Sequence, residues 1–352
     1  MSGSLWQSRR RLGRVSMRLA LGLSLGPALL LAPRLANPQA ASPGSGGVPA
    51  DGAAWLHRIQ QAAANSSYEG TLMFSAGGVV SSSRLQHYCD GKQRYERIEV
   101  LDGQARLQYR HNEQLITFWP ASKLAMVEQR DPVAEFPALP LAAGSRAADS
   151  YDVRAVGKDR VAGRDAELLM LKPRDKHRYA HRLWADRETG LLLRSDVLGP
   201  AGEVLETSAF TTVQTGSKPQ PDAILRPMKK LEGYRVLRPV AERTQIEAEG
   251  WMLAKPVPGF ALVSCVKRPL DAGVVDAGPP VQVLQSVFSD GLAHVSVFIE
   301  PYDLVRHKQP MSTSLGATHT LMNRRGDWWV TIVGEVPLAT VQLFETMLER
   351  KR

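Results

Sequence analysis

The most regular pattern of apolar and polar positions lies near the C-terminal end, in Val281 to Glu300. Val281, Val283 and Val287 before Asp290-Gly291, and Val295, Val297 and Ile299 after it, follow a period of two, which is that of a half-buried β-strand. Because glycine readily adopts the positive φ of a tight turn, Asp-Gly between two such runs predicts a β-hairpin. By parity, Phe288 and Phe298 fall on the face opposite to the valines, so the hairpin needs cover on two sides or a partner. We expect a partner to contact Phe288, Val295, Val297 and Phe298.

A longer series of short apolar runs precedes this hairpin. Turn residues such as Asp90-Gly91 and Asp102-Gly103 interrupt the series about every 8 to 12 residues, which is typical of an antiparallel meander. The expected strands are Tyr68–Phe74, Val79–Cys89, Arg94–Leu101, Ala105–Arg110, Gln114–Trp119, Tyr151–Val156, Ala166–Pro173, Tyr179–Ala185, Leu191–Leu198 and Val204–Val213.

One helix is expected before these strands, at Ala53 to Ala64, where apolar residues follow helical spacing. Together they predict a large curved sheet, an unclosed antiparallel β-barrel packed on a helix. A barrel of this size leaves room for a ligand, although parity leaves open which face is inside. The candidates to line such a lipid cavity are Met73, Leu85, Ile98, Val100, Leu107, Ile116, Phe118 and Trp184.

A second domain follows the stretch Thr215 to Pro227, whose prolines and polar residues interrupt every strand pattern and indicate a linker. Beyond it the patterns predict a smaller α+β domain with about four or five antiparallel strands and a C-terminal helix after Pro337. The fold class is therefore mainly β. The expected division is a signal peptide at 1–41, a large β domain at 42–214, a linker at 215–235 and a small domain at 236–352.

The N-terminal 41 residues have the features of a secretory signal. Arginines precede an apolar core at Leu19 to Ala32, and this core is shorter than the roughly 20 apolar residues of a membrane-spanning helix. Met17 is an alternative start. Export of a chain without a lipidation cysteine near the cleavage region predicts a location in the periplasm.

Most of the net charge of +9 lies in the N-terminal segment and not in the rest of the chain. Six arginines and no acidic residue lie in the first 41 residues, so the rest has 38 basic and 35 acidic side chains, a charge of +3. This near balance gives no indication of a nucleic-acid partner. A hydrophobic share of 43% and a charged share of 22% are ordinary for a globular protein.

The search for catalytic or metal-binding motifs is negative, which predicts a protein that is not an enzyme and has no cofactor. His177 and His181 have the one metal-like spacing, but on a strand they would lie about 13 Å apart, too far to bind one ion. Cys89 and Cys265 lie in different expected domains. A disulfide between them would join the domains, and the alternative is two separate thiols.

The order of several motifs resembles the MucB/RseB family of regulators of the envelope-stress sigma factor. They are Tyr68-Glu69-Gly70-Thr71, RIEVLDG at Arg97 to Gly103 with Arg110, LWAD and TGLLLRSD within His177 to Asp196, Pro258-Gly259-Phe260, SDGLAHVSVFIE, Gly316-Ala317 and VGEVP. The resemblance covers nearly all of the chain after the signal.

This resemblance implies a large domain like the lipoprotein carriers LolA and LolB, with an acyl-binding cavity. It also implies a periplasmic protein that binds the periplasmic part of a membrane-spanning anti-sigma factor and protects it from proteolysis. Lipopolysaccharide or lipoprotein acyl chains would release that protection. The alternative is a lipid or lipoprotein carrier, which leaves the second domain without a purpose. Homo-oligomerisation stays open.

Overall fold

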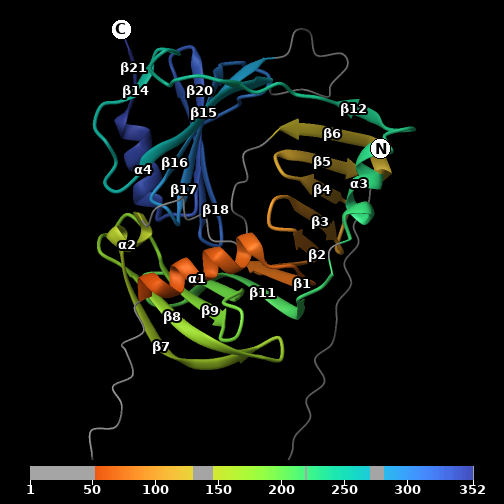
Figure 1. Ribbon diagram of the computed structural model, residues 1–352. Helices are drawn as coiled ribbons and strands as arrows, with labels where there is room; N and C mark the ends of the chain where they lie inside the picture. The colour runs from red at the N-terminus through yellow and green to blue at the C-terminus, as the bar shows by residue number, and fades with distance from the viewer. Residues whose placement is uncertain (1–51, 130–145, 219, 270–280, 352) are drawn as a thin grey trace, which may run out of the picture. The chain divides into compact units, whose positions relative to one another are not determined.

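A twelve-stranded sheet forms the larger part of the computed structural model, which describes residues 52–129, 146–218, 220–269 and 281–351 (Figure 1). Its strand order is β12-β6-β5-β4-β3-β2-β1-β11-β10-β9-β8-β7, and β12 and β7 form its two free ends. Every neighbouring pair is antiparallel except β12 with β6. The strands are β1 Tyr68–Ala76, β2 Val79–Cys89, β3 Arg94–Val100, β4 Leu107–His111, β5 Gln114–Trp119, β6 Leu124–Gln129, β7 Tyr151–Val161, β8 Arg164–Pro173, β9 Ala180–Asp186, β10 Leu192–Leu198, β11 Val204–Thr215 and β12 Arg235–Leu237.

The predicted open, mainly β large domain is confirmed, and the turn chemistry explains its meander. Gly77 and Gly78, both with positive φ, join β1 to β2. At the next turn the Asp90 carboxylate accepts hydrogen bonds from the amides of Lys92 and Gln93, at 3.0 and 2.8 Å. Such local bonds fix hairpin register, so nearest neighbours in sequence become nearest neighbours in the sheet.

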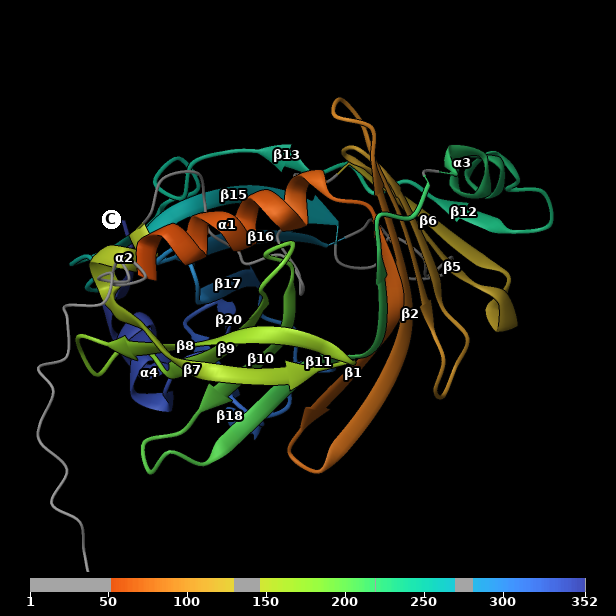
Figure 2. The same cartoon turned by 60° about the horizontal axis from the view of Figure 1, so that its bottom comes forward.

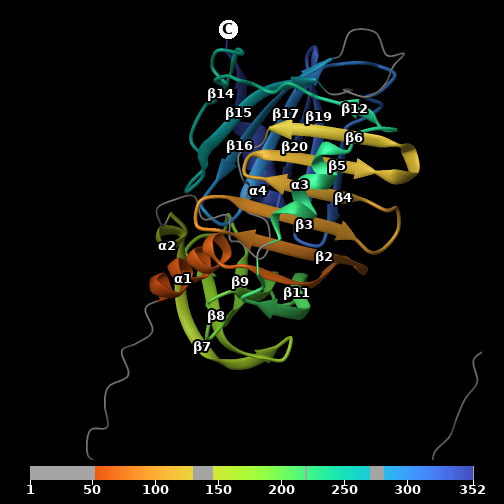
Figure 3. The ribbon, with the colours of Figure 1, turned by 45° about the vertical axis from the view of Figure 1, so that its right-hand side comes forward.

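The helices cover different parts of the chain. Helix α1 (Gly52–Asn65) runs beside the strands at the β7 end, as Figure 2 shows. Helix α2 (Arg146–Ser150) is a single turn before β7, and a 3-10 turn, η1 (Pro120–Ser122), precedes β6. Helix α3 (Pro221–Lys229) lies against β3 and β4 in the other half of the sheet (Figure 3).

The stretch expected to be a linker therefore contains regular structure. Ile224 and Met228 of α3 are buried in an apolar cluster with residues of β2 to β6. Strand β12 then pairs with β6. The sequence pattern predicted neither of these two strands. Helix α3 and strand β12 both pack on the large sheet, so the chain leaves that sheet at Leu237.

The second sheet has seven strands in the order β13-β15-β16-β17-β20-β19-β18. Helix α4 (Leu338–Met347) buries Val341 and Phe344 in its core, and β14 pairs with β21 beside it. The strands are β13 Glu242–Arg243, β14 Trp251–Leu253, β15 Ala261–Pro269, β16 Gln282–Ser289, β17 His294–Pro301, β18 Met311–Leu315, β19 Thr318–Arg325, β20 Trp328–Gly334 and β21 Leu348–Arg350. The predicted smaller domain with a C-terminal helix is confirmed, with more strands than expected. All described residues belong to one compact unit of the chain.

Candidate functional site

The apolar side of α1 packs on the large sheet. Leu56 and Ile59 join the buried residues of β7 to β10 in what we call the helix cluster: Leu56, Ile59, Ala147, Tyr151, Leu169, Leu171, Leu183, Ala185, Leu192 and Leu292. Further along the helix, Ala62 joins a second group, the central cluster, which contains Tyr68, Leu85, Ala166, Trp184, Leu191, Leu193 and Phe210.

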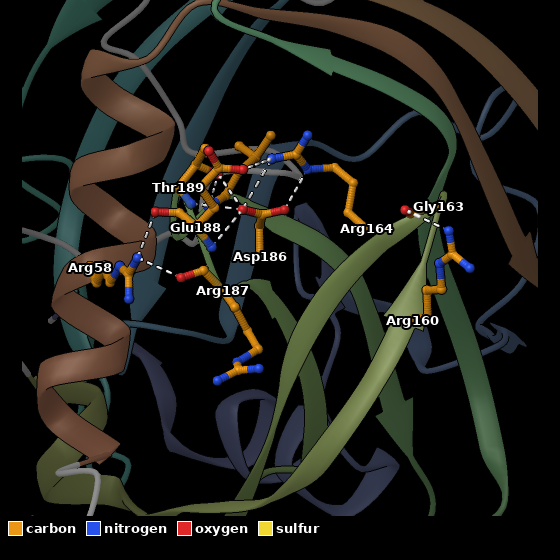
Figure 4. Close-up of polar contacts among 9 residues, drawn as sticks. Arg58, Arg160, Gly163, Arg164, Asp186, Arg187, Glu188 and Thr189 are labelled. Carbon is orange, nitrogen blue, oxygen red and sulfur yellow. Dashed lines mark hydrogen bonds and ion pairs between the residues drawn. The ribbon is translucent and has the colours of Figure 1, made fainter.

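Polar contacts fix the position of α1 over these clusters (Figure 4). The Arg58 guanidinium donates hydrogen bonds to the carbonyl oxygens of Arg187 and Glu188, both at 2.8 Å. The Asp186 carboxylate accepts bonds from the amides of Glu188 and Thr189 at 3.0 and 2.7 Å and pairs with Arg164. Burial opposes ionisation of Asp186, but the bonds from Arg164 and Thr189 outweigh it and lower its pKa. The turn between β9 and β10 is thus held by its own hydrogen bonds and in turn bonds to the helix.

The eight residues predicted to line a lipid cavity lie on two faces of the sheet. Leu85 and Trp184 belong to the central cluster, Ile98 packs against it, and Val100 shares the same sheet face by register. Leu107, Ile116 and Phe118 lie in the separate cluster beneath α3. Met73 has the opposite parity to Leu72, which packs on the central cluster. One cavity cannot take all eight, and the assignment of lipid contacts to any of them stays a prediction.

A shallow polar groove of about 460 Å³ lies across the middle of the sheet, over β11, β1 and β2. The Gln86 side-chain amide donates to the Glu69 carboxylate at 3.1 Å, and Ser217 donates to the same carboxylate at 3.3 Å. The groove is lined by Glu69, Gly70, Thr71, Arg84, Leu85, Gln86, Thr212, Val213 and Gln214. Among the polar lining residues, Gln86 and Glu69 therefore bond to each other, and Arg84 pairs with Glu99 at 3.5 Å.

In the small domain, the predicted hairpin is present but its turn is longer than the expected tight Asp-Gly turn. Ser289 pairs with His294, so the turn spans Asp290 to Ala293 and Phe288 lies opposite Val295. Phe288 therefore shares a face with the valines of β17, so the face expected for it relative to those valines was wrong. A two-residue turn at Asp290-Gly291 would give the same face, because two extra turn residues leave the parity of the pairing unchanged.

This register decides which predicted partner contacts are accessible. Phe288, Val295 and Val297 are buried in the core of the small domain, where the Phe288 ring lies 5.1 Å from that of Phe344. Phe298 points to the other face and is half-buried, with the Arg268 guanidinium 5.9 Å from its ring centre. As contacts of a partner, all four stay predictions.

A buried ion pair joins the two domains. Arg178, between β8 and β9, places Nη1 3.1 Å from Oδ2 of Asp290, and both side chains have no exposed surface. The Tyr151 hydroxyl donates to the same carboxylate at 3.4 Å, and Arg178 also donates to the Pro258 carbonyl at 2.9 Å. Burial raises the pKa of Asp290, while the amides of its turn and Arg178 act in the opposite direction. The sequence marked Asp290 only as a turn residue, and Arg178 carried no signal at all.

A second contact between the domains involves two carboxyl groups. Glu206 of β11 accepts hydrogen bonds from the Ala317 amide at 2.9 Å and the Thr318 hydroxyl at 3.3 Å. Burial raises its pKa. Glu335, between β20 and α4, has its pKa raised to about 8 by burial and by the nearby Glu206 charge. The charge at this contact therefore depends on whether Glu206 and Glu335 are protonated.

The cysteines and His181 show no arrangement for redox chemistry or metal binding among the described residues. Both cysteines are free, so they are two separate thiols, and Cys265 lies 3.3 Å from the Ser286 hydroxyl. Burial holds His181 neutral, with a pKa of about 4. Within the described ranges, no group of three or more His, Cys, Asp or Glu side chains could hold a metal ion. None of the described helices is long and apolar enough to cross a membrane.

Two families of known domains match this chain in the order of its two sheets. The MucB/RseB N-terminal domain family matches residues 51–228, and the MucB/RseB C-terminal domain family matches residues 245–349. The sigma factor AlgU regulatory protein MucB of Pseudomonas aeruginosa is 33% identical over 300 residues, which cover 83% of this chain and 89% of MucB. The sigma-E factor regulatory protein RseB of Haemophilus influenzae is 24% identical, over 82% of this chain and 87% of RseB.

Solved structures give the same result. A crystal structure of MucB in complex with MucA(peri) is similar with a TM-score of 0.65 at 29% identity, over 86% of this chain and 100% of the MucB chain. A crystal structure of MucB alone has a TM-score of 0.62 at 29% identity, over 88% of this chain and 100% of that one. These relatives are named as regulatory proteins and not as enzymes.

Proposed function

Because the chain belongs to the MucB/RseB family of sigma factor regulatory proteins, we propose that it binds the periplasmic segment of a membrane-spanning anti-sigma factor. It acts in the periplasm, shields that segment from the protease that begins its destruction, and releases it when lipid or lipopolysaccharide signals envelope stress. The sequence-based resemblance to this family is confirmed, and the regulatory role follows from it.

One observation carries the proposal of partner binding. The MucB chain solved in complex with MucA(peri) is similar to this chain over 86% of its length, which includes both sheets. A protein that only carried lipid would have use for the large sheet alone, whereas both domains here match regulators.

The lipid response is supported by the apolar clusters beneath α1. The helix and the open sheet enclose aliphatic side chains with almost no exposed surface, and an acyl chain is the ligand that such surroundings favour. A lipid lowers affinity for the partner only if it binds the partner-free form more tightly.

The experiment is a calorimetric titration of residues 42–352 with the periplasmic segment of the anti-sigma factor from the same genome, with and without lipopolysaccharide. We expect binding that weakens when lipopolysaccharide is present. If the segment does not bind while lipid is still taken up, the protein is a carrier and the regulatory proposal fails. Binding that lipid leaves unchanged removes the sensing half alone.

A further inference from the structure

One side chain of the small domain lies inside the helix cluster of the large domain. Leu292, in the turn between β16 and β17, is 6% exposed and packs with Leu56 and Ile59 of α1 and with the leucines of β8 to β10. The other described members of this cluster all come from the large domain. Leu292 therefore occupies apolar space that the large domain would otherwise leave open to solvent or to a ligand.

The turn presents Leu292 and Asp290 together. Oδ1 of Asp290 accepts hydrogen bonds from the amides of Leu292 and Ala293, at 2.8 and 2.7 Å. Its Oδ2 faces Arg178 at 3.1 Å and the Tyr151 hydroxyl at 3.4 Å. A branched apolar side chain and a carboxylate thus enter the large domain side by side, the first among leucines and the second against a buried guanidinium.

We propose that this turn is a built-in occupant of the lipid site, in which Leu292 stands for an acyl chain and the Asp290 carboxylate for an anionic headgroup. This inference rests on the proposed lipid response. An acyl chain with an anionic head would replace both groups, since it fills the helix cluster and supplies Arg178 with a new negative charge. Removal of Asp290 would leave the buried Arg178 with the partly exposed Asp175, at 3.1 Å, as its remaining acidic partner. Loss of the buried partner is costly, and only a charged lipid headgroup would replace it, so displacement favours charged lipids.

The displacement links lipid binding to the contact between the domains. When the turn withdraws, Leu292 and the ion pair leave the large domain together, so a lipid and the docked small domain exclude each other at this point. A ligand that excludes one state shifts the protein to the other by its differential affinity. Displacement of the turn by a lipid would therefore change the arrangement of the two domains that binds the partner.

The test compares laurate with dodecanol, two twelve-carbon probes that differ in headgroup charge, by calorimetry on the full mature chain. Leu292→Ala removes the apolar competitor, and we expect it to bind laurate about tenfold more tightly than the unmodified protein does. Dodecanol should bind the unmodified protein more weakly than laurate, because it cannot pair with Arg178.

The chain contains a matched control for this substitution. Leu304 follows Asp303 in another turn of the small domain, where Oδ1 of Asp303 accepts hydrogen bonds from the amides of Val305 and Arg306. Leu304 is 78% exposed. Leu304→Ala should leave laurate affinity unchanged, and Leu292→Met, which keeps an apolar side chain of similar volume, should do the same.

A second measurement needs no variant. Hydrogen exchange of residues 290–293 in the unmodified protein should become faster on addition of laurate, because the withdrawn turn is exposed to solvent. Equal laurate affinity of Leu292→Ala and the unmodified protein, or unchanged exchange at the turn under saturating laurate, overturns this inference and leaves the lipid response intact. Absence of laurate binding by every variant overturns both, while partner binding still stands.

Discussion

At the scale of single residues, Arg178 and Asp290 are the most informative pair. Taking two charges out of water costs several kcal/mol per ion. The pair regains this through its own attraction, the Tyr151 hydroxyl, the Pro258 carbonyl and the Asp175 carboxylate, which lies 3.1 Å from Arg178. The aromatic rings of Tyr151 and Phe260 also face the guanidinium, at 5.8 and 5.1 Å. Such a pair gives little net stability but specifies one docked geometry.

We expect Arg178→Met to lower the free energy of unfolding by about 3–5 kcal/mol, because it leaves the Asp290 carboxylate buried without a counter-charge. The double variant Arg178→Met/Asp290→Asn should recover part of this loss. Urea denaturation measures both. The control is Arg226→Met, whose partner Asp222 and own side chain are each 75% exposed, and its effect should stay below about 1 kcal/mol. Equal effects of Arg178→Met and Arg226→Met would contradict this account.

At the scale of elements, the strands were predictable and their faces were not. Alternation and turn residues found β2 and β5 at their observed bounds, because local hydrogen bonds such as those of Asp90 decide where a strand stops. The face that Phe288 shares with β17 follows from its pairing with Val295, and the alternation within one strand does not give this pairing across the hairpin. Strand β6 and helix α3 were missed because their stability comes from tertiary packing. Ala125 of β6 and Ile224 and Met228 of α3 are buried in the same apolar cluster.

For the site, too, residues with a local periodic signal could be predicted and residues defined by tertiary contacts could not. The sequence identified the apolar residues of the sheet, such as Leu85 and Trp184, from periodicity. Leu292 and Arg178 carry no periodic signal, since their role comes from segments more than 100 positions apart that meet only in the folded chain. Tertiary contacts of this kind lie beyond any local pattern.

Helix α1 is held by Arg58, which Figure 4 shows bonded to the β9–β10 turn. Arg58→Ala should cost about 1–3 kcal/mol of stability, since it removes two charge-assisted hydrogen bonds to carbonyl oxygens. It should also speed amide exchange in α1 more than elsewhere. Arg160→Ala is the control, because the Arg160 side chain bonds within its own hairpin, to the Gly163 carbonyl at 3.2 Å, and not to the β9–β10 turn. Uniform exchange over the whole chain would show that Arg58 does not anchor the helix.

At the scale of the whole molecule, the domain contact responds to pH. The folded-state pKa of Glu335 is raised to about 8, so the folded protein binds a proton there that the unfolded chain releases near pH 4.5. The stability from this proton is fully present below pH 4.5 and is lost as pH rises through 8. Desolvation lowers the pKa values of His181, His294 and His319, so these histidines affect stability only below about pH 6.5.

We therefore expect the free energy of unfolding, and with it Tm, to fall between pH 6.8 and pH 8. The free energy should fall by at most about 1.4 kcal/mol per pH unit. Glu335→Gln, which mimics the protonated carboxyl group, should remove most of this slope. Calorimetric scans of both proteins at the two pH values give the comparison. A slope of the same size in Glu335→Gln would assign the pH dependence to other groups.

The path of the chain between the domains has a kinetic consequence. The chain leaves the large sheet at β12, one end of the strand order, whereas Tyr151 and Arg178 dock the small domain at the β7 end. Once the docking contact opens, the small domain stays tethered, and its local concentration near Arg178 is set by the tether and not by the number of molecules in the cell. Re-docking is then a first-order process, so each molecule resets at the same rate whether the protein is scarce or abundant.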